Sequence, residues 1–249
     1  MCRHLAYLGP SQPLSRLLLE PPHALVRQAW APRDMRGGGT INADGFGIGW
    51  YPGGEGEPVR YRRATPMWSD TALTGLAAAT VSGAVLAAVR SATAGMPVVE
   101  TAAAPFATGP WLFSHNGVVT GWPWSVAKLA ERLPTTDLLT LPAPTDSALL
   151  WALVRDRLRA GAPMAEAVAA TVSEVAVAAP GSRLNLLLTD GTAVVATTHG
   201  HSLAVREDGS CVLLSSEALD DDPGWRSVPD RQLITATARG LHLTPLGEA

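Results

Sequence analysis

The residues Met1-Cys2-Arg3-His4-Leu5-Ala6-Tyr7-Leu8-Gly9 open the sequence and place a thiol directly after the first methionine. Removal of Met1 would give Cys2 a free α-amino group beside its side chain. An α-amino group titrates near ~7.7 to 8.0 and a thiol near ~8.5, so the amine is able to accept the thiol proton at neutral pH. The stretch therefore predicts a nucleophile that carries its own base. The alternative is a buried cysteine in a first strand, since free cysteine is among the most buried side chains.

The composition restricts the class of protein and its partners. The 249 residues fit one domain over residues 1–249, and 19 basic against 22 acidic residues give a formal charge of −3. No basic run could follow a phosphate backbone and no apolar stretch of ~18 residues could cross a membrane, so neither nucleic acid nor membrane is an expected partner. The start does not resemble a secretion signal, which favours a cytoplasmic protein. The two cysteines, Cys2 and Cys211, form no disulfide framework or metal motif, and no cofactor is expected, although a bridge between them stays open.

The apolar pattern predicts strands, then helices, then strands again. Because the two kinds do not alternate regularly, this order favours an α+β fold with antiparallel sheets packed against helices. The expected strands cover residues 2–8, 42–51, 59–63, 84–89, 111–113, 184–188, 193–198, 202–206, 211–215, 233–236 and 241–243. The expected helices cover residues 14–19, 24–30, 69–78, 122–132, 146–159 and 164–177.

Glycine and polar residues mark particular points in these elements. Strand 42–51 has glycine at alternate positions, which predicts a backbone that lies close to another part of the chain. The pairs Asp190-Gly191 and Asp208-Gly209 predict the turns of two hairpins. The apolar runs 84–89 and 111–113 both stop at polar groups, where chemistry is to be expected.

Attack by a thiolate on an amide carbonyl needs donors for the developing oxyanion. The pair Asn116-Gly117 would supply a side-chain amide and an unhindered backbone N–H. One such donor contributes roughly 3 to 4 kcal/mol of transition-state stabilisation. The alternative is an ordinary turn, which Asn-Gly often forms. His115 would bind substrate or protonate the leaving group, and its alternative is a structural role.

Three further residues would hold the charged end of a substrate. Arg90 follows an apolar strand, where an inward guanidinium needs an anion, so it would bind a carboxylate in a fork geometry, with the hydroxyl of Thr93 beside it. The alternative for Arg90 is an internal ion pair. Asp146 would accept a substrate ammonium, and its alternative is to cap the helix, a role that Thr145 could also take.

The remaining histidines and tryptophans give weaker signals. His199 and His201 alternate like ligands on one strand face, but two histidines without a third ligand are a weak metal signal, and no metal is expected. Trp50, Trp111 or Trp225 could form an aromatic wall for a cationic group.

Taken in order, the segments around these residues resemble the class II glutamine amidotransferases, a branch of the N-terminal nucleophile hydrolases. The resemblance covers about the first 150 residues well and implies a four-layer αββα sandwich. It implies Cys2 as nucleophile with its amine as base, Asn116 and Gly117 as the oxyanion hole, and Arg90, Thr93 and Asp146 as the clamp for a γ-glutamyl group. The segments that carry it are Met1-Cys2-Arg3, Asn42-Ala43-Asp44-Gly45-Phe46-Gly47, Arg90-Ser91-Ala92-Thr93, Phe113-Ser114-His115-Asn116-Gly117 and Thr145-Asp146-Ser147, with Ser215-Ser216-Glu217 in the closing half.

The chain departs from the family pattern at Ala148, where an acidic residue is common, and at Ala102-Ala103-Ala104, where a polar residue often precedes Pro105. Within the family, residues 1–9, 89–97 and 220–225 look like the amidohydrolases of ergothioneine biosynthesis, which remove glutamate from γ-glutamyl-hercynylcysteine sulfoxide. That likeness implies a small-molecule γ-glutamyl substrate and a γ-glutamyl thioester on Cys2. The alternatives are a glutaminase subunit that supplies ammonia to a separate synthase, and a catalytically silent binding domain.

Overall fold

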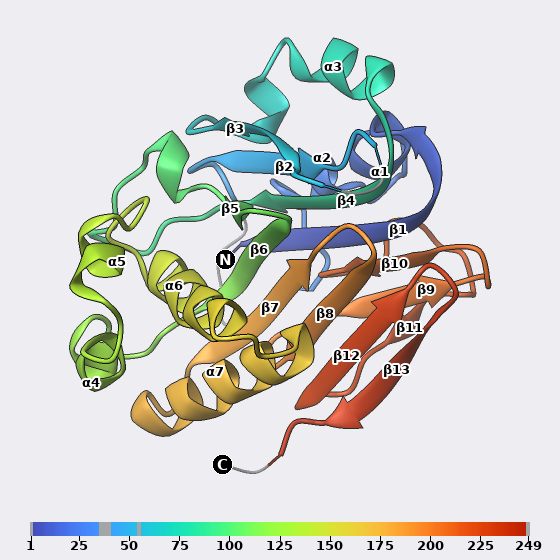
Figure 1. The fold of residues 1–249 in the computed structure, drawn as a ribbon. Helices are drawn as coiled ribbons and strands as arrows, with labels where there is room; N and C mark the ends of the chain where they lie inside the picture. The colour runs from blue at the N-terminus through green and yellow to red at the C-terminus, as the bar shows by residue number, and fades with distance from the viewer. Residues whose placement is uncertain (1, 35–40, 54–55, 248–249) are drawn as a thin grey trace.

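The computed structural model describes residues 2–34, 41–53 and 56–247, which fold into two facing β-sheets with helices on both outer sides (Figure 1). Neighbouring strands in both sheets are antiparallel. The first sheet has the order β11-β9-β10-β1-β4-β2-β3, and the second β13-β12-β8-β7-β6-β5. The first contains β1 (Arg3–Pro13), β2 (Phe46–Trp50), β3 (Val59–Arg63), β4 (Val81–Val89), β9 (Ala204–Glu207), β10 (Val212–Ser215) and β11 (Arg226–Ser227). The second contains β5 (Phe106–Thr108), β6 (Trp111–Val118), β7 (Arg183–Thr189), β8 (Ala193–Thr198), β12 (Gln232–Thr237) and β13 (Gly240–Pro245).

Helices complete the four-layer αββα sandwich that the resemblance implied. The short helices α1 (Ser15–Leu18), α2 (Leu25–Gln28) and α3 (Leu73–Ala79) cover the first sheet. The longer α6 (Asp146–Arg159) and α7 (Met164–Ala178) cover the second, beside α4 (Ala127–Ala130) and α5 (Thr135–Leu139). The helix expected over residues 122–132 is broken into a 3₁₀ turn (Trp124–Val126) followed by α4. The helix expected over 69–78 begins only at Leu73, and α5, β5 and β11 were not expected.

Alternation along the strands sorts the core into three layers. In β1, Leu5 and Tyr7 pack under the first helices, whereas Ala6 and Leu8 lie between the sheets. In β6, Phe113 packs against α6 and α7. Each sheet is thus buried on both faces, which explains why its strands read as nearly continuous apolar runs.

The glycines of β2 confirm the predicted close approach. A Cβ at Gly47 would lie 2.3 Å from the backbone oxygen of Ala104, and one at Gly49 would lie 2.6 Å from Leu112 Cδ1. The turn glycines Gly191 and Gly209 have φ values of 91° and 81°, as the predicted hairpins require.

The strand expected to stop at Phe113 continues to Val118. Asn116 pairs with Asn185 of β7, and Gly117 pairs with Leu184. The alternative of an Asn-Gly turn is therefore wrong, because both residues lie inside a strand ladder.

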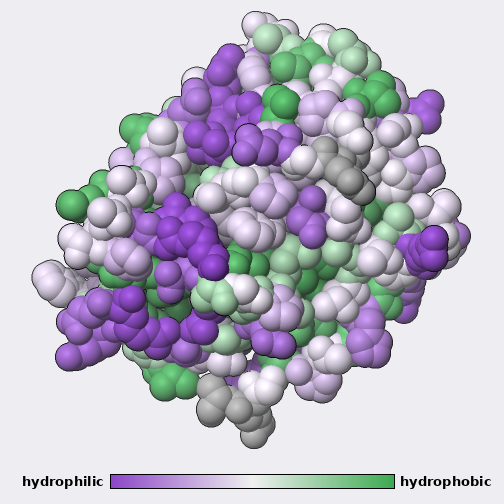
Figure 2. All heavy atoms as spheres, viewed as in Figure 1, coloured by the Kyte–Doolittle hydropathy of each residue, from purple (hydrophilic) through white to green (hydrophobic). Residues whose placement is uncertain are grey.

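Hydrophilic side chains on the face shown in Figure 2 gather over the helices around α5 and α6. Ion pairs connect charged side chains in this part of the fold: Asp137 pairs with Arg155 and Arg159, and Glu174 pairs with Arg132 and Arg157. In the described part of the chain, no helix is long and apolar enough to cross a membrane.

Candidate active site

Cys2 lies directly before β1, at the end of the first sheet where the ends of three neighbouring strands lie together. Arg3 and Phe46 are both paired with Val89, so the start of β1, the start of β2 and the end of β4 lie side by side. The Cys2 Sγ atom lies 3.8 Å from the carbonyl oxygen of Ser91 and is partly exposed. Both cysteines are free thiols, which rejects a Cys2–Cys211 bridge. Met1 lies outside the described residues.

Asn116 of the second sheet lies close to these strand ends. Its side chain is fully buried, and Nδ2 donates to Ser216 Oγ over 3.1 Å. The same hydroxyl oxygen accepts from the backbone N–H of His4 over 2.9 Å. One serine therefore connects the amide of Asn116 to the strand that carries Cys2. Oδ1 of Asn116 has no hydrogen-bond partner in the described structure.

The backbone N–H of Gly117 points away from β7 and forms no hydrogen bond with that strand. The N–H of Leu184 donates to the carbonyl oxygen of His199, so Gly117 and Leu184 form a non-hydrogen-bonded pair. On the other side of β6, β5 pairs only as far as residues 111–113. Within the described residues, the N–H of Gly117 thus has no ladder partner. A Cβ at this position would lie 1.8 Å from the Arg183 oxygen, so only glycine allows the two strands to approach.

Arg90 is a nearly buried cation whose partners are neutral. Its Nη1 donates to the carbonyl oxygens of Pro97 at 2.8 Å and Asp44 at 3.5 Å, and the residue is 8% exposed. No described carboxylate lies within ion-pair distance, which rejects the internal ion pair. A buried guanidinium without an anion is costly, so the site favours a carboxylate ligand.

The loop after Arg90 is fixed by Asp44, whose Oδ2 accepts from the N–H of Ala92 over 2.7 Å. Thr93 is exposed at the start of a turn in which the N–H of Met96 donates to its carbonyl oxygen. The hydroxyl of Thr93 is therefore accessible from solvent on the loop that follows Arg90.

Asp146 is held at the start of α6 without capping it. Thr145 is the N-cap and accepts from the N–H of Ala148 over 3.2 Å. Asp146 Oδ2 instead accepts from the N–H of Val119, just after β6, over 3.0 Å. This carboxylate joins α6 to the end of the strand that carries Asn116 and Gly117.

His115 lies on the opposite face of β6 from Asn116. Its Nε2 lies 2.9 Å from the carbonyl oxygen of Arg183, which can only accept, so Nε2 carries the proton. Its Nδ1 lies 2.9 Å from Ser147 Oγ. Burial lowers the pKa of His115, partly offset by the nearby Asp146 carboxylate. The lowered pKa favours the neutral imidazole, whose two nitrogens are both engaged on the face of β6 opposite Asn116.

The other candidates are placed in different surroundings. His201 Nε2 accepts from Arg3 over 3.2 Å, whereas His199 lies at the outer side of the second sheet. Among the described residues, no group of three or more His, Cys, Asp or Glu side chains could hold a metal ion. Trp50 and Trp111 pack into the cores, and Trp225 already carries the guanidinium of Arg206 5.3 Å from its ring centre.

The sequence matches the family model described as "Glutamine amidotransferases class-II" over residues 25–209. The chain belongs to this family. The chain is 41% identical to the gamma-glutamyl-hercynylcysteine sulfoxide hydrolase of Mycolicibacterium smegmatis over 246 residues, covering 99% of this chain and 100% of the relative. The hydrolase of the same name from Mycobacterium tuberculosis strain CDC 1551 is 41% identical over 249 residues, covering 100% and 98%.

Two solved structures share the fold. A glutamine aminotransferase class-II domain protein from Silicibacter pomeroyi has a TM-score of 0.66 and 25% identity, covering 99% of this chain and 100% of that one. The glutamine phosphoribosylpyrophosphate amidotransferase of B. subtilis has a TM-score of 0.71 and 14% identity, covering all of this chain and 50% of its own. The second likeness concerns the fold alone.

Two departures from the amidotransferase pattern fit this packing. Ala148 is fully buried in the core under α6. Ala103 is fully buried, and the backbone of Ala104 lies against Gly47, so small side chains suit this contact. Sequence reasoning did not identify Ser216 or Asp44 as site residues. Both residues lie in the segments that resemble the family, but no pattern in the sequence indicated their hydrogen-bond partners.

Proposed function

We propose that this class II amidotransferase domain hydrolyses the γ-glutamyl amide bond of γ-glutamyl-hercynylcysteine sulfoxide, releasing glutamate and hercynylcysteine sulfoxide. The observation that carries the proposal is the 41% identity, over essentially the full length of both chains, to two hydrolases of that name. The partner is then a small molecule, and we propose that the reaction takes place in the cytoplasm.

In the proposed acylation step, the Cys2 thiol gives its proton to the α-amino group that removal of Met1 exposes. The thiolate forms a bond to the γ-carbonyl carbon, and the carbonyl oxygen becomes an oxyanion. Its donors would be the Asn116 side-chain amide and the Gly117 N–H, which has no ladder partner among the described residues. The carbon–nitrogen bond then breaks as the leaving amine takes the proton from the α-ammonium group, leaving a γ-glutamyl thioester.

In deacylation, water attacks the thioester carbon and gives a proton to the same amine. The carbon–sulfur bond breaks, the α-ammonium group returns the proton to the sulfur so that the thiol is restored, and glutamate leaves. Both steps use the same oxyanion donors, so loss of either donor is expected to slow both.

The γ-glutamyl end would be held by charge. Among the described residues, the buried cationic Arg90 has only carbonyl oxygens as partners, so it would bind the α-carboxylate, with Thr93 beside it. Asp146, which is 5% exposed, would bind the α-ammonium group. His115 contacts Ser147, the residue after Asp146, and is a predicted substrate contact.

The test is the release of glutamate by purified protein. Cys2→Ser should acylate far more slowly than wild type, and Cys2→Ala should be inactive with its stability little changed. Wild type incubated with substrate and quenched in acid should carry one γ-glutamyl group on the peptide that contains Cys2. Modification elsewhere, or full activity in Cys2→Ala, would refute the mechanism.

Two further measurements separate the alternatives. Intact mass should show that Met1 is absent from active protein, whereas its retention would favour a silent binding domain. A glutaminase activity that exceeds sulfoxide cleavage and increases when a synthase is added would favour the ammonia-supplying subunit.

A further inference from the structure

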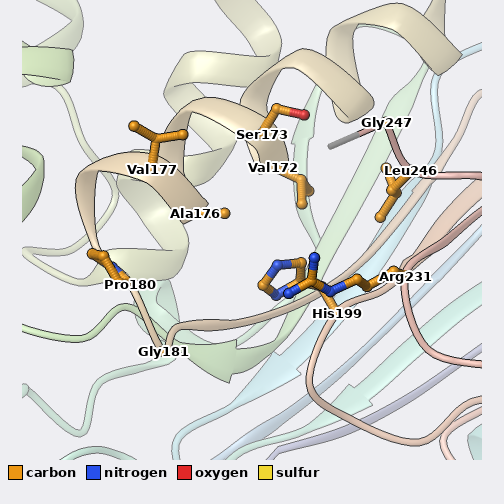
Figure 3. Close-up of a pocket in the computed structure, with 10 residues that line it drawn as sticks. All are labelled: Val172, Ser173, Ala176, Val177, Pro180, Gly181, His199, Arg231, Leu246 and Gly247. Carbon is orange, nitrogen blue, oxygen red and sulfur yellow. The ribbon is translucent and has the colours of Figure 1, made fainter. Parts of the chain in front are cut away.

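A cavity of about 400 Å³ lies on the outer side of the second sheet, between α7 and the loops after β8 and before β12. Figure 3 shows the side chains of His199 and Arg231 next to each other beneath α7. The apolar wall of the cavity is formed by Val172, Ala176 and Leu246. Pockets of this size commonly bind small molecules through an apolar wall and a few fixed polar groups.

Arg231 presents to this cavity a cation that has no partner in the described part of the chain. It is the one non-glycine residue of the described chain with a positive φ, 57°. Residues held in this region are costly and gather at binding sites. Its guanidinium has no hydrogen-bond or ion-pair partner among the described residues, whereas its carbonyl oxygen is fixed by the N–H of Leu246 over 2.9 Å. The backbone is thus anchored while the charge remains available for an anion.

His199 adds an acceptor with a fixed direction. Its backbone N–H donates to Asn185 Oδ1 over 2.8 Å, and its Nδ1 lies 3.2 Å from the carbonyl oxygen of Ser182. A carbonyl oxygen only accepts, so this contact selects the tautomer in which Nδ1 carries the proton and Nε2 is an acceptor. In this tautomer, Nε2 can accept a hydrogen bond from a donor on the ligand.

The end of α7 favours a cation at the same place. The helix ends at Ala178, and its last turn contains no basic residue to balance the partial negative charge of the C-terminus. Val177 and Pro180 of this end line the cavity. The cavity therefore offers a cation for a carboxylate, an acceptor and helix end for an ammonium group, and an apolar wall.

We infer that this cavity binds a free α-amino acid with an apolar side chain, separately from the Cys2 site. Arg231 binds the carboxylate, and His199 Nε2 accepts from the ammonium group. The side chain packs against Val172, Ala176 and Leu246.

The test is calorimetric titration of the protein with L-leucine. We expect saturable binding at one site per chain. 4-Methylpentanoate, which lacks the ammonium group, and 3-methylbutylamine, which lacks the carboxylate, should each bind at least 10-fold more weakly. Equal binding of either analogue would overturn the assignment, as would no binding of leucine.

Variants distinguish the site from others on the protein. Arg231→Gly removes the cation but keeps the backbone conformation, so leucine affinity should fall at least 10-fold with no fall in Tm. His199→Phe should also weaken binding. Arg239→Gln, at another exposed arginine, and Cys2→Ala should bind leucine like wild type. Unchanged affinity in Arg231→Gly, or lost affinity in Cys2→Ala, would refute the inference.

Discussion

Ser216→Ala is the substitution that most sharply tests the connection between the two sheets. Ser216 Oγ is the acceptor for two buried donors, the His4 N–H at 2.9 Å and Asn116 Nδ2 at 3.1 Å. Each buried donor left without a partner costs roughly 1 to 3 kcal/mol. The free energy of unfolding should therefore fall by about 2 kcal/mol or more.

The same change should slow catalysis, because it releases the amide of Asn116 from its fixed direction. Complete loss of an oxyanion donor lowers kcat by ~10² to 10³-fold. Asn116 remains present in this variant, so a smaller fall in kcat of about 10-fold is expected, with KM little changed.

The assay combines urea denaturation with steady-state glutamate release. The neighbouring Ser215→Ala is the matched control, because among the described residues Ser215 Oγ accepts only a long 3.5 Å contact from Gln28. It should change both quantities much less. A Ser216→Ala variant that loses stability but keeps the wild-type kcat would refute the positioning role.

Three further predictions follow from single contacts. Gly117→Ala places a Cβ 1.8 Å from the Arg183 oxygen and should lower the unfolding free energy, measured by urea denaturation, by about 1 to 3 kcal/mol. The control Gly75→Ala has open space around it and should not destabilise the protein. Equal effects of the two substitutions would contradict the close approach. Arg90→Gln should lower kcat/KM for the γ-glutamyl substrate by about 10- to 100-fold without unfolding the protein, and an unchanged kcat/KM would exclude Arg90 from carboxylate binding. Burial lowers the pKa of His4 well below 6.5, so the unfolded state binds more protons below that pH, and stability is lost as pH falls below about 6.5. His4→Gln should show a shallower loss between pH 7.5 and 5.5, and an identical pH dependence would contradict this prediction.

Local signals in the sequence predicted the hairpins and the close approach of β2. Turns such as Asp190-Gly191 have their own backbone chemistry, and alternate glycines show where another chain segment lies. The length of β6 was not predictable in this way. Ser114 and Asn116 look like the end of a strand, yet they are buried because His4 and Ser216 of the other sheet supply their hydrogen bonds.

The residues of the candidate site likewise fall into those that the sequence could predict and those that it could not. Cys2, Arg90 and Asp146 could be proposed because their charge or nucleophilicity requires a partner. The structure places each at the end of a strand or helix. The face of β6 that carries His115 could not be known, because a strand that was expected to end at Phe113 gave no alternation to follow. Thr145, not Asp146, caps α6, whereas Asp146 accepts from the N–H of Val119, a contact between distant segments that the sequence did not reveal.

The most direct test of the proposed function is a comparison of kcat/KM for glutamate release from γ-glutamyl-hercynylcysteine sulfoxide and from glutamine, measured with the same preparation of protein from which Met1 has been removed. The account predicts a far higher kcat/KM for the sulfoxide and no glutamate release from it by Cys2→Ala. Equal or better use of glutamine would contradict the proposed substrate.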